Sequence, residues 1–283
     1  MRAGWRQCID DHAGQRGLRR CAFRRREDDA TRQAPRRGAA VTDVPRSHPR
    51  YESLRTRDAI VAGVQKGITS PHGLIAHGRG EAYDYLLGEK SHDFALAAID
   101  AAAHMLIHAR HPVVSVNGNV AALVPDELVE LADTLDAPLE VNIFHSSKER
   151  EEAIRQFLEE HGAKRLLMPS RDAELDFIDS NRKFVHPQGI YRADVIFVPL
   201  EDGDRCQALR KMGKAVVTVD LNPMSRTSRT ASITIVDNVV RSLPLLIARI
   251  RELRASAPEQ PGAEFDNARN LAAAERAIRA ESR

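Results

Sequence analysis

Residues 194–219, DVIFVPLEDGDRCQALRKMGKAVVTV, decide the fold. Two short apolar runs, at 194–200 and 215–219, flank a segment at 203–213 that has the composition of a helix. Strands that are apolar throughout are typical of a parallel sheet covered on both faces, and a helix supplies the crossover that parallel pairing needs. The stretch therefore predicts a strand–helix–strand unit of an α/β protein.

The same alternation continues on both sides of this unit. Further apolar runs bounded by turns lie at 113–116, 139–144, 165–168 and 232–236. Helical segments separate most of these runs, at 125–136, 147–161 and 238–254. Because crossovers between parallel strands are right-handed, we expect residues 112–255 to form a Rossmann-like, doubly wound and mostly parallel sheet.

A region of helical pattern precedes this core. We expect a first helix that Ser47 caps and Gly67 ends. The glycines and histidines of residues 70–78 are interpreted as a loop, which a short helix follows, and an alanine-rich helix is expected at about 92–110. Residues 46–111 are thus predicted to be an N-terminal helical subdomain.

The two ends of the chain differ from the rest. Residues 1–40 hold eleven arginines and no lysine against five acidic residues, whereas the whole chain of 283 residues has a formal charge of +2. This composition predicts a disordered leader at 1–45, and residues 256–283 are expected to be a linker and a peripheral helix. An arginine arm can bind nucleic acid through counterion release. No aromatic platform or reader motif accompanies it, so we favour an extension without that function.

Composition also bears on location and on metals. The chain has no run of 18 apolar residues and no apolar segment behind its first arginines, so we expect neither a membrane span nor a secretory signal. Three cysteines without disulfide or metal spacing favour a cytoplasmic setting. His104, His108 and His111 have the spacing of metal ligands, but no cysteine accompanies them, and no metal site is predicted there.

The residues that directly follow each strand indicate where ligands bind, because open α/β sheets hold ligands beyond the carboxyl ends of their strands. After 215–219 comes DLNPMSRTSRT, in which Asp220 and Asn222 suit a ribose or a base, and Arg226 and Arg229 suit phosphate. A solvated turn closed by the same Asp and Asn explains the pattern equally well. From the spacing alone, both interpretations stay open.

Two more strand ends allow a ligand or a purely structural role. Asn117 and Asn119 enclose a glycine in SVNGN, which either turns backbone N–H groups toward a ligand or forms a tight left-handed turn. The segment HSSKERE, starting at His145, opens a helix whose N-terminus favours an anion. The alternative is that Ser146 or Ser147 only caps that helix.

The segment SPHGLIAHGRGEAYDYL, residues 70–86, contains part of a phosphate-loop pattern in Gly73, Gly78 and Arg79. Arg79 replaces the lysine of that pattern, and Gly80 stands where a metal-binding serine or threonine belongs, so a true P-loop is excluded. We interpret the segment as a flexible loop that brings Arg79, His72 and His77 to the start of a helix, where they can bind phosphate.

Six motifs follow one another in order between about Ser47 and about Arg254: SHPRYESL, PHGLIAHGRGEAYDYLLGE, SVNGN, LEVNIFH, GIYRADVIFVPLEDGDR and VDLNPMSRTSR. They resemble the archaeal phosphopantothenate synthetases, the 4-phosphopantoate–β-alanine ligases. The resemblance implies an ATP-dependent ligase of coenzyme A biosynthesis that releases AMP and diphosphate through a phosphopantoyl adenylate. It also implies Mg²⁺ as a cofactor and a homodimer.

The resemblance extends to particular residues. Arg57 and Arg79 match catalytic arginines of the family that contact ATP. The adenosine-binding segments match Asp220, Leu221, Asn222, Arg226, Thr227, Asp237 and Asn238. For 4-phosphopantoate we infer a phosphate site at the helix start and contacts to its hydroxyl and carboxylate nearby; the candidates are His145, Ser146, Ser147, Arg150, Asn117 and Asn119. Glu81 or a water is a candidate base for the amine of β-alanine.

Two other functions stay open at this point. One is a different nucleotide-dependent enzyme on the same scaffold, which would release ADP in place of AMP. The other is a nucleic-acid-associated protein that uses the arginine leader.

Overall fold

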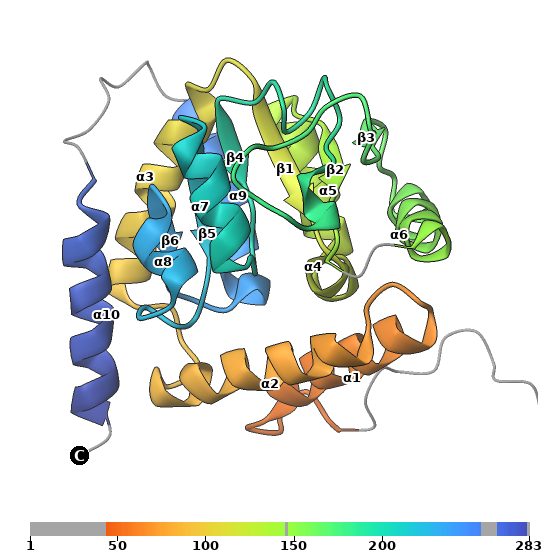
Figure 1. Ribbon diagram of the computed structural model, residues 1–283. Helices are drawn as coiled ribbons and strands as arrows, with labels where there is room; N and C mark the ends of the chain where they lie inside the picture. Colours follow the sequence, from red (N-terminus) through yellow and green to blue (C-terminus); the bar gives the residue numbers. More distant parts are fainter. Residues whose placement is uncertain (1–43, 145–146, 256–264, 282–283) are drawn as a thin grey trace, which may run out of the picture. The chain divides into compact units, whose positions relative to one another are not determined.

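The sheet has six parallel strands in the order β3-β2-β1-β4-β5-β6 (Figure 1). This computed structural model describes residues 44–144, 147–255 and 265–281. The strands are β1 Pro112–Val116, β2 Leu139–Val141, β3 Leu166–Leu167, β4 Val195–Phe197, β5 Ala215–Val219 and β6 Ile233–Ile235. Six apolar runs were predicted, and a strand lies at each of them, with β1 beginning one residue earlier than its run. The order is that of a doubly wound Rossmann sheet, so the predicted α/β fold is confirmed.

Helices cover both faces of the sheet because alternate strand residues point to opposite sides. On one face, the side chains of β1, β4 and β5 join a core with α3 Asp93–Ile107, α5 Pro125–Leu135 and α9 Val239–Ala255. On the other face, Val113, Ile196 and Val216 pack with Cys206 and Leu209 of α7 Gly203–Lys211. Burial on both sides explains why these strands are apolar throughout.

The connection between β3 and β4 is long and contains only a short 3-10 helix, η1 Asn181–Lys183. It is nevertheless packed on the sheet, because Leu175, Val185 and Ile190 are buried in the same cluster as α7. This connection brings η1 to the carboxyl ends of β1 and β4, where the candidate site lies.

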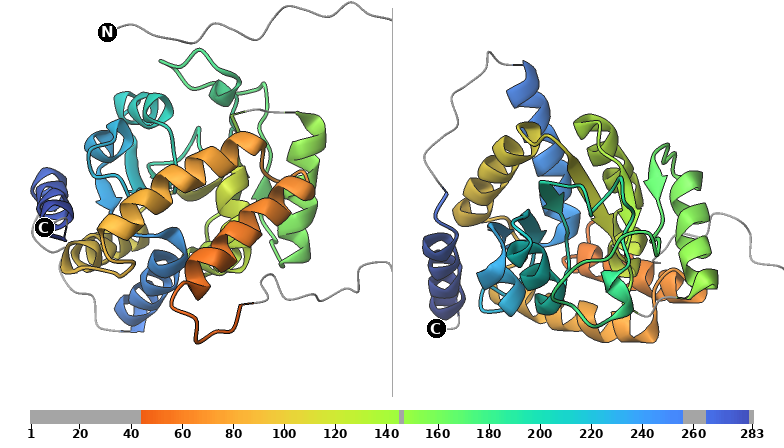
Figure 2. Two further views of the ribbon diagram at one scale, coloured as in Figure 1. Left: turned by 90° about the horizontal axis from the view of Figure 1, so that it is seen from below. Right: turned by 45° about the horizontal axis from the view of Figure 1, so that its top comes forward.

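Two helices, α1 Tyr51–Gln65 and α2 Pro71–Leu86, lie side by side across the carboxyl ends of the strands (Figures 1 and 2). They belong to the same compact unit as the sheet, residues 41–283. The helix α1 begins at Tyr51 and not at Ser47, because His48 and Tyr51 close turns on carbonyls of Pro45 and His48 before the helix starts. It ends before Gly67, which has the expected positive φ of 73°.

The predicted loop at 70–78 is wrong, since these residues form the first half of α2. Pro71 stands at the first helical position, where its missing N–H costs nothing and its fixed φ suits the helix. Gly73 faces Thr69 and Asn119 so closely that no larger residue fits without movement. Tertiary contact thus outweighs the low helix propensity of glycine at this position.

Side chains cap the helices that follow the strands. Asn117 Oδ1 accepts from the backbone N–H groups of Asn119 and Val120, both at 3.1 Å, and so begins α4 Gly118–Leu123. The tight left-handed turn considered for this segment is therefore wrong. Ser147 caps α6 Lys148–Glu160, and Ser225 caps α8 Arg226–Thr230, a short helix that the strand-end pattern did not predict.

The C-terminal helix α10 Asn267–Glu281 is attached more firmly than its predicted peripheral position implies. Leu271 and Ala274 are buried against Leu87, Leu221 and Val236. The spacing of Leu271, Ala274 and Ile278 gives α10 one apolar stripe, which requires a partner surface. No helix in the described ranges is long and apolar enough to cross a membrane.

We expect opposite effects from alanine at two glycines of α2. Gly73→Ala should lower the free energy of unfolding by about 1–3 kcal/mol, because its Cβ would overlap Thr69 Oγ1 and Asn119 Oδ1. Gly78→Ala should raise it by about 0.5–1 kcal/mol, because nothing lies within 4 Å of its Cβ and alanine favours the helix. Urea unfolding of both variants measures the difference. Equal effects would show that Gly73 is not held in close contact.

Candidate active site

A cavity of about 780 Å³ lies between α2 and the carboxyl ends of the strands. Among the candidate site residues that the sequence singled out, those that line it are Arg79, Glu81, Asn117, Asn119, Arg150, Asp220, Leu221, Asn222, Thr227 and Asn238. The lining does not include Arg57, Ser147, Arg226, Arg229 or Asp237. His145 and Ser146 lie outside the described residues.

The cavity includes the point where the order of the sheet reverses, between the ends of β1 and β4. Here Asn117 Nδ2 donates to the carbonyls of Pro199 and Leu200, at 3.0 and 3.2 Å, and joins the two strand ends. Asn119 Nδ2 donates to the carbonyl of Gly73 at 3.0 Å, and its Oδ1 accepts from Thr69 Oγ1 at 2.5 Å. Both amides therefore shape the wall of the cavity, and Asn119 also fixes α4 against α2.

The end of β5 forms one side of the cavity. The carboxylate of Asp220 accepts from the N–H of Asn222 at 2.9 Å and from Ser225 Oγ at 2.5 Å. Burial raises the pKa of Asp220, against these hydrogen bonds.

Thr227 is buried and donates to the carbonyl of Glu201 at 2.9 Å, whereas Arg226 pairs with Asp204 on the outer surface.

The end of β6 holds α2 in place. Asp237 is buried and accepts from Ser91 Oγ at 2.5 Å and from Arg241 Nη2 at 2.7 Å. The buried Asp84 of α2 accepts from the same Arg241 nitrogen at 2.5 Å and from Asn238 Nδ2 at 2.8 Å. Asp84 was not expected from the sequence; its position among the apolar residues of a helix is the only local signal. This network fixes α2 to the start of α9.

The two arginines that the resemblance singles out differ in their surroundings. Arg57 Nε donates to both oxygens of Glu81, at 2.8 and 3.0 Å, and this pairing raises the pKa of Arg57. Arg57 thus reaches the cavity only through its partner, since Glu81 lines it. Arg79 also lines the cavity and makes no hydrogen bond or ion pair within the described part of the chain. Its guanidinium is free to bind an anion.

Buried charges that the sequence did not reveal form another part of the cavity wall and the layer behind it. Arg182 of η1 donates through Nη2 to Glu201 at 2.8 Å and through Nε to Asn142 at 2.9 Å. Arg205 of α7 pairs with the same Glu201 at 2.5 Å. The side chains of Glu201 and Arg205 have no exposed surface, and that of Arg182 has 5%. Only the acidic strand-end segment at 201–205 hinted at this cluster.

Comparison with known proteins shows the family of this chain. A model of the phosphopantothenate/pantothenate synthetase family matches residues 94–281. This chain belongs to that family. It is 50% identical over 237 residues to a protein of Methanosarcina mazei named 4-phosphopantoate–β-alanine ligase, covering 83% of this chain and 93% of the relative. A protein of the same name from Thermococcus kodakarensis is 47% identical over 235 residues, which cover 82% and 90% of the two chains.

The family named from the sequence motifs is therefore confirmed. The matched region contains every strand of the sheet and all the strand-end segments that line the cavity. The alignments with these two relatives, over 237 and 235 residues, cover more of the chain than the family model does.

In this member of the phosphopantothenate synthetase family, a buried carboxyl group also binds the connection between β3 and β4 to the sheet. Glu140 of β2 accepts from the N–H of His186 at 2.9 Å and from the N–H of Ile190 at 2.6 Å. Burial raises the pKa of Glu140 to about 7, although both hydrogen bonds and the nearby Arg205 oppose the shift. The folded protein therefore takes up a proton on Glu140 at a pH where the unfolded chain does not.

The pKa of Glu140 predicts a pH dependence of stability. Because its folded value of about 7 lies above the usual 4.5, its contribution is complete below pH 4.5 and is lost as the pH rises to 7. The loss should be about 3 kcal/mol, since one pH unit corresponds to about 1.4 kcal/mol. Urea unfolding from pH 4.5 to 7.5 should show this slope in the wild type and in Glu160→Gln, an exposed control. Glu140→Gln should lack it, and an unchanged slope would contradict the assignment.

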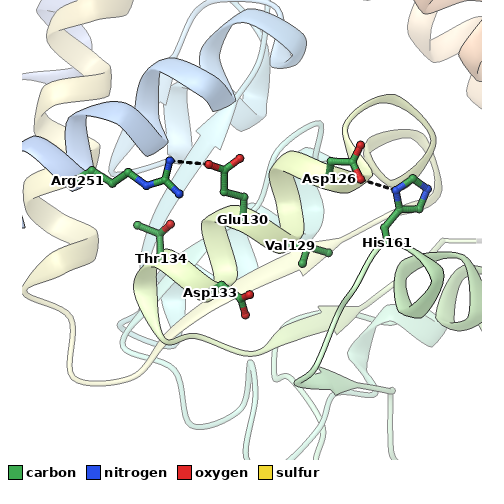
Figure 3. A pocket seen from close by; sticks show the side chains of 7 residues that line it. All are labelled: Asp126, Val129, Glu130, Asp133, Thr134, His161 and Arg251. Carbon is green, nitrogen blue, oxygen red and sulfur yellow. Dashed lines mark hydrogen bonds and ion pairs between the residues drawn. The ribbon is translucent and has the colours of Figure 1, made fainter.

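A second hollow of about 480 Å³ lies on the outer side of α5, between α6 and α9 (Figure 3). A hydrogen bond between His161 and Asp126 at 2.5 Å and an ion pair between Arg251 and Glu130 at 2.6 Å line it (Figure 3). Among the described residues, none at the carboxyl end of a strand lines this hollow, and its charged side chains have partners. The cavity at the strand ends is therefore the candidate active site of this synthetase family member.

Proposed function

We propose that this chain joins 4-phosphopantoate to β-alanine, consumes ATP, and releases AMP and diphosphate through a phosphopantoyl adenylate. The observation that carries the proposal is the cavity, which unites the unpaired Arg79 with the end of β5 in a chain whose relatives are named for this reaction. The alternative of a nucleic-acid-associated protein rests on the leader, which lies outside the described residues.

The nucleotide is assigned to the side of the cavity that β5, β6 and α2 form. Asp220 and Asn222 present groups for the ribose and base, with Leu221, Thr227 and Asn238 beside them. Arg79 would stabilise the negative charge that grows as the carboxylate of 4-phosphopantoate attacks the α-phosphorus. Arg57 and Arg226, which do not line the cavity, would contact ATP only after their pairs with Glu81 and Asp204 open. Asp237 would act through Arg241 and Asn238.

The phosphate of 4-phosphopantoate is assigned to the start of α6. Backbone N–H groups at a helix N-terminus favour an anion, and Arg150 in the first turn lines the cavity. Ser147 caps this helix, so it would position the segment, and Asn117 and Asn119 would shape the wall beside the reacting carboxylate. His145 and Ser146 belong to the same proposal.

The proposal includes Mg²⁺, which would enter the site bound to ATP. No three histidine, cysteine or carboxylate side chains converge within the described ranges, which fits a metal held mainly by phosphates. Asp202 is the candidate protein ligand, because it lines the cavity and its side chain is 36% exposed; its pair with Arg182 would open to bind the ion. The ion would lower the charge repulsion between the two anionic substrates.

A nucleotide assay tests the function. The purified chain is incubated with ATP, Mg²⁺, 4-phosphopantoate and β-alanine, and AMP, ADP, diphosphate and the amide product are separated by chromatography. We expect AMP formation that requires 4-phosphopantoate, and a new amide once β-alanine is added. Release of ADP would indicate a different nucleotide-dependent enzyme, and equal rates with unphosphorylated pantoate would overturn the substrate.

A homodimer belongs to the same proposal. The helices α1 and α2 leave Val61, Ile75 and Leu86 exposed by 44%, 65% and 41%, which is the kind of apolar surface that a second copy covers. Sedimentation equilibrium should show a dimer that Ile75→Asp dissociates. The control is Phe177→Asp on the β3–β4 connection, where the side chain is also 65% exposed. A wild-type monomer would contradict the proposal.

A further inference from the structure

One imidazole of the cavity has a buried nitrogen without a partner. His77 lies in the middle of α2 and lines the cavity, and its Nε2 atom is buried and makes no hydrogen bond. Buried polar atoms are satisfied in nearly all native proteins, so such an atom next to a ligand cavity calls for a functional explanation.

The surroundings of His77 keep its ring neutral. Burial lowers the pKa of His77, and the guanidinium of Arg57 on α1 acts in the same direction. Glu81 and Asp84 on α2 oppose the shift, but their charges are paired with Arg57 and Arg241. A neutral imidazole has one nitrogen with a free lone pair, which is able to accept a proton near neutral pH.

The carboxylates around the cavity already form hydrogen bonds or ion pairs with other groups. Both oxygens of Glu81 accept from Arg57 Nε, which argues against the base considered from the sequence. Asp220 accepts from Ser225 and Asn222, and Glu201 pairs with two arginines. Asp202 caps α7 and pairs with Arg182.

We propose that His77 is the base that takes a proton from the ammonium group of β-alanine. The inference rests on the proposed ligase function and concerns only its second step. One proton moves from the ammonium to Nε2 of His77, and the lone pair released on nitrogen forms the C–N bond at the acyl carbon of the adenylate. The bond from that carbon to the AMP oxygen breaks, its electron pair leaves with AMP, and the nitrogen loses its second proton to water.

Separating the two half-reactions tests this role. Formation of the adenylate is followed as exchange of labelled diphosphate into ATP, with 4-phosphopantoate present and β-alanine absent. Transfer to β-alanine is followed as formation of the amide. His77→Gln should leave the exchange unchanged and should slow amide formation about 100-fold. Hydroxylamine is a free base at neutral pH, so its reaction with the adenylate should also stay at the wild-type rate.

The pH profile supplies an independent readout. In the wild type, amide formation should fall as the pH drops through the lowered pKa of His77, because the protonated ring accepts no further proton. In His77→Gln that limb should disappear, and the rate should rise with pH as free β-alanine amine becomes available. His77→Asn serves as a second variant in case one substitution disturbs α2.

The controls separate the possible failures. His161→Gln, at the outer hollow of Figure 3, should behave as the wild type in both half-reactions. An equal loss of exchange, hydroxylamine reaction and amide formation in the His77 variants would overturn the proposal and leave His77 a structural residue. A selective loss of amide formation in His72→Gln would assign the role to the other cavity imidazole. A wild type without exchange would contradict the ligase function itself.

Discussion

Arg79→Ala is expected to reduce 4-phosphopantoate-dependent AMP formation by about 10²–10³-fold, the usual cost of removing one group that stabilises transition-state charge. Arg79 is the cavity arginine that no hydrogen bond or ion pair engages in the described part of the chain, so its charge is available to the reacting phosphate. The same AMP and diphosphate assay, run at saturating ATP, measures the loss. An unchanged rate would remove Arg79 from the reaction.

Two further variants make this result specific. Arg79→Lys should recover part of the rate, because lysine keeps the charge but not the planar pair of donors that matches phosphate. Arg251→Ala removes an arginine that is engaged with Glu130 at the outer hollow and should leave the rate unchanged. Equal losses at Arg79 and Arg251 would indicate a general electrostatic effect and not a site.

Glu201→Gln should destabilise the protein by about 3–5 kcal/mol, the cost of removing one partner from a buried ion pair. Glu201 has no exposed side-chain surface and neutralises two arginines, Arg182 and Arg205. Its substitution leaves excess positive charge behind the cavity wall, where water cannot solvate it. Guanidinium unfolding at pH 7 measures the change.

A surface pair provides the matched comparison. Glu152 pairs with Arg155 at 2.5 Å, but its side chain is 46% exposed. Glu152→Gln should cause no measurable loss of stability, because water replaces the partner at such a site. Similar midpoints of guanidinium unfolding for Glu201→Gln and Glu152→Gln would show that the buried cluster tolerates a net charge. That result would contradict the expected loss of about 3–5 kcal/mol.

The outline of the fold and the position of the site were predictable from local patterns. The apolar runs at 194–200 and 215–219 must be buried on both sides, and only a parallel sheet between helix layers does so. The polar residues after each strand then had to meet at one edge, and most of the residues singled out there, such as Asp220 and Asn238, line one cavity. Both inferences use only the period of a strand and the direction of the chain.

What the sequence by itself determined was therefore the α/β class, the alternation of strands and crossover helices in the core, the family and the edge of the sheet where ligands bind. The tertiary structure alone decided that residues 70–78 are helical, that Arg182 meets Glu201 behind the cavity wall, and that Arg57 is paired while Arg79 is free. The physical reason is the separation along the chain over which each kind of interaction acts. Burial and backbone geometry act over a few residues and leave a periodic trace, whereas the partner of a charge depends on which distant segments fold onto the same edge.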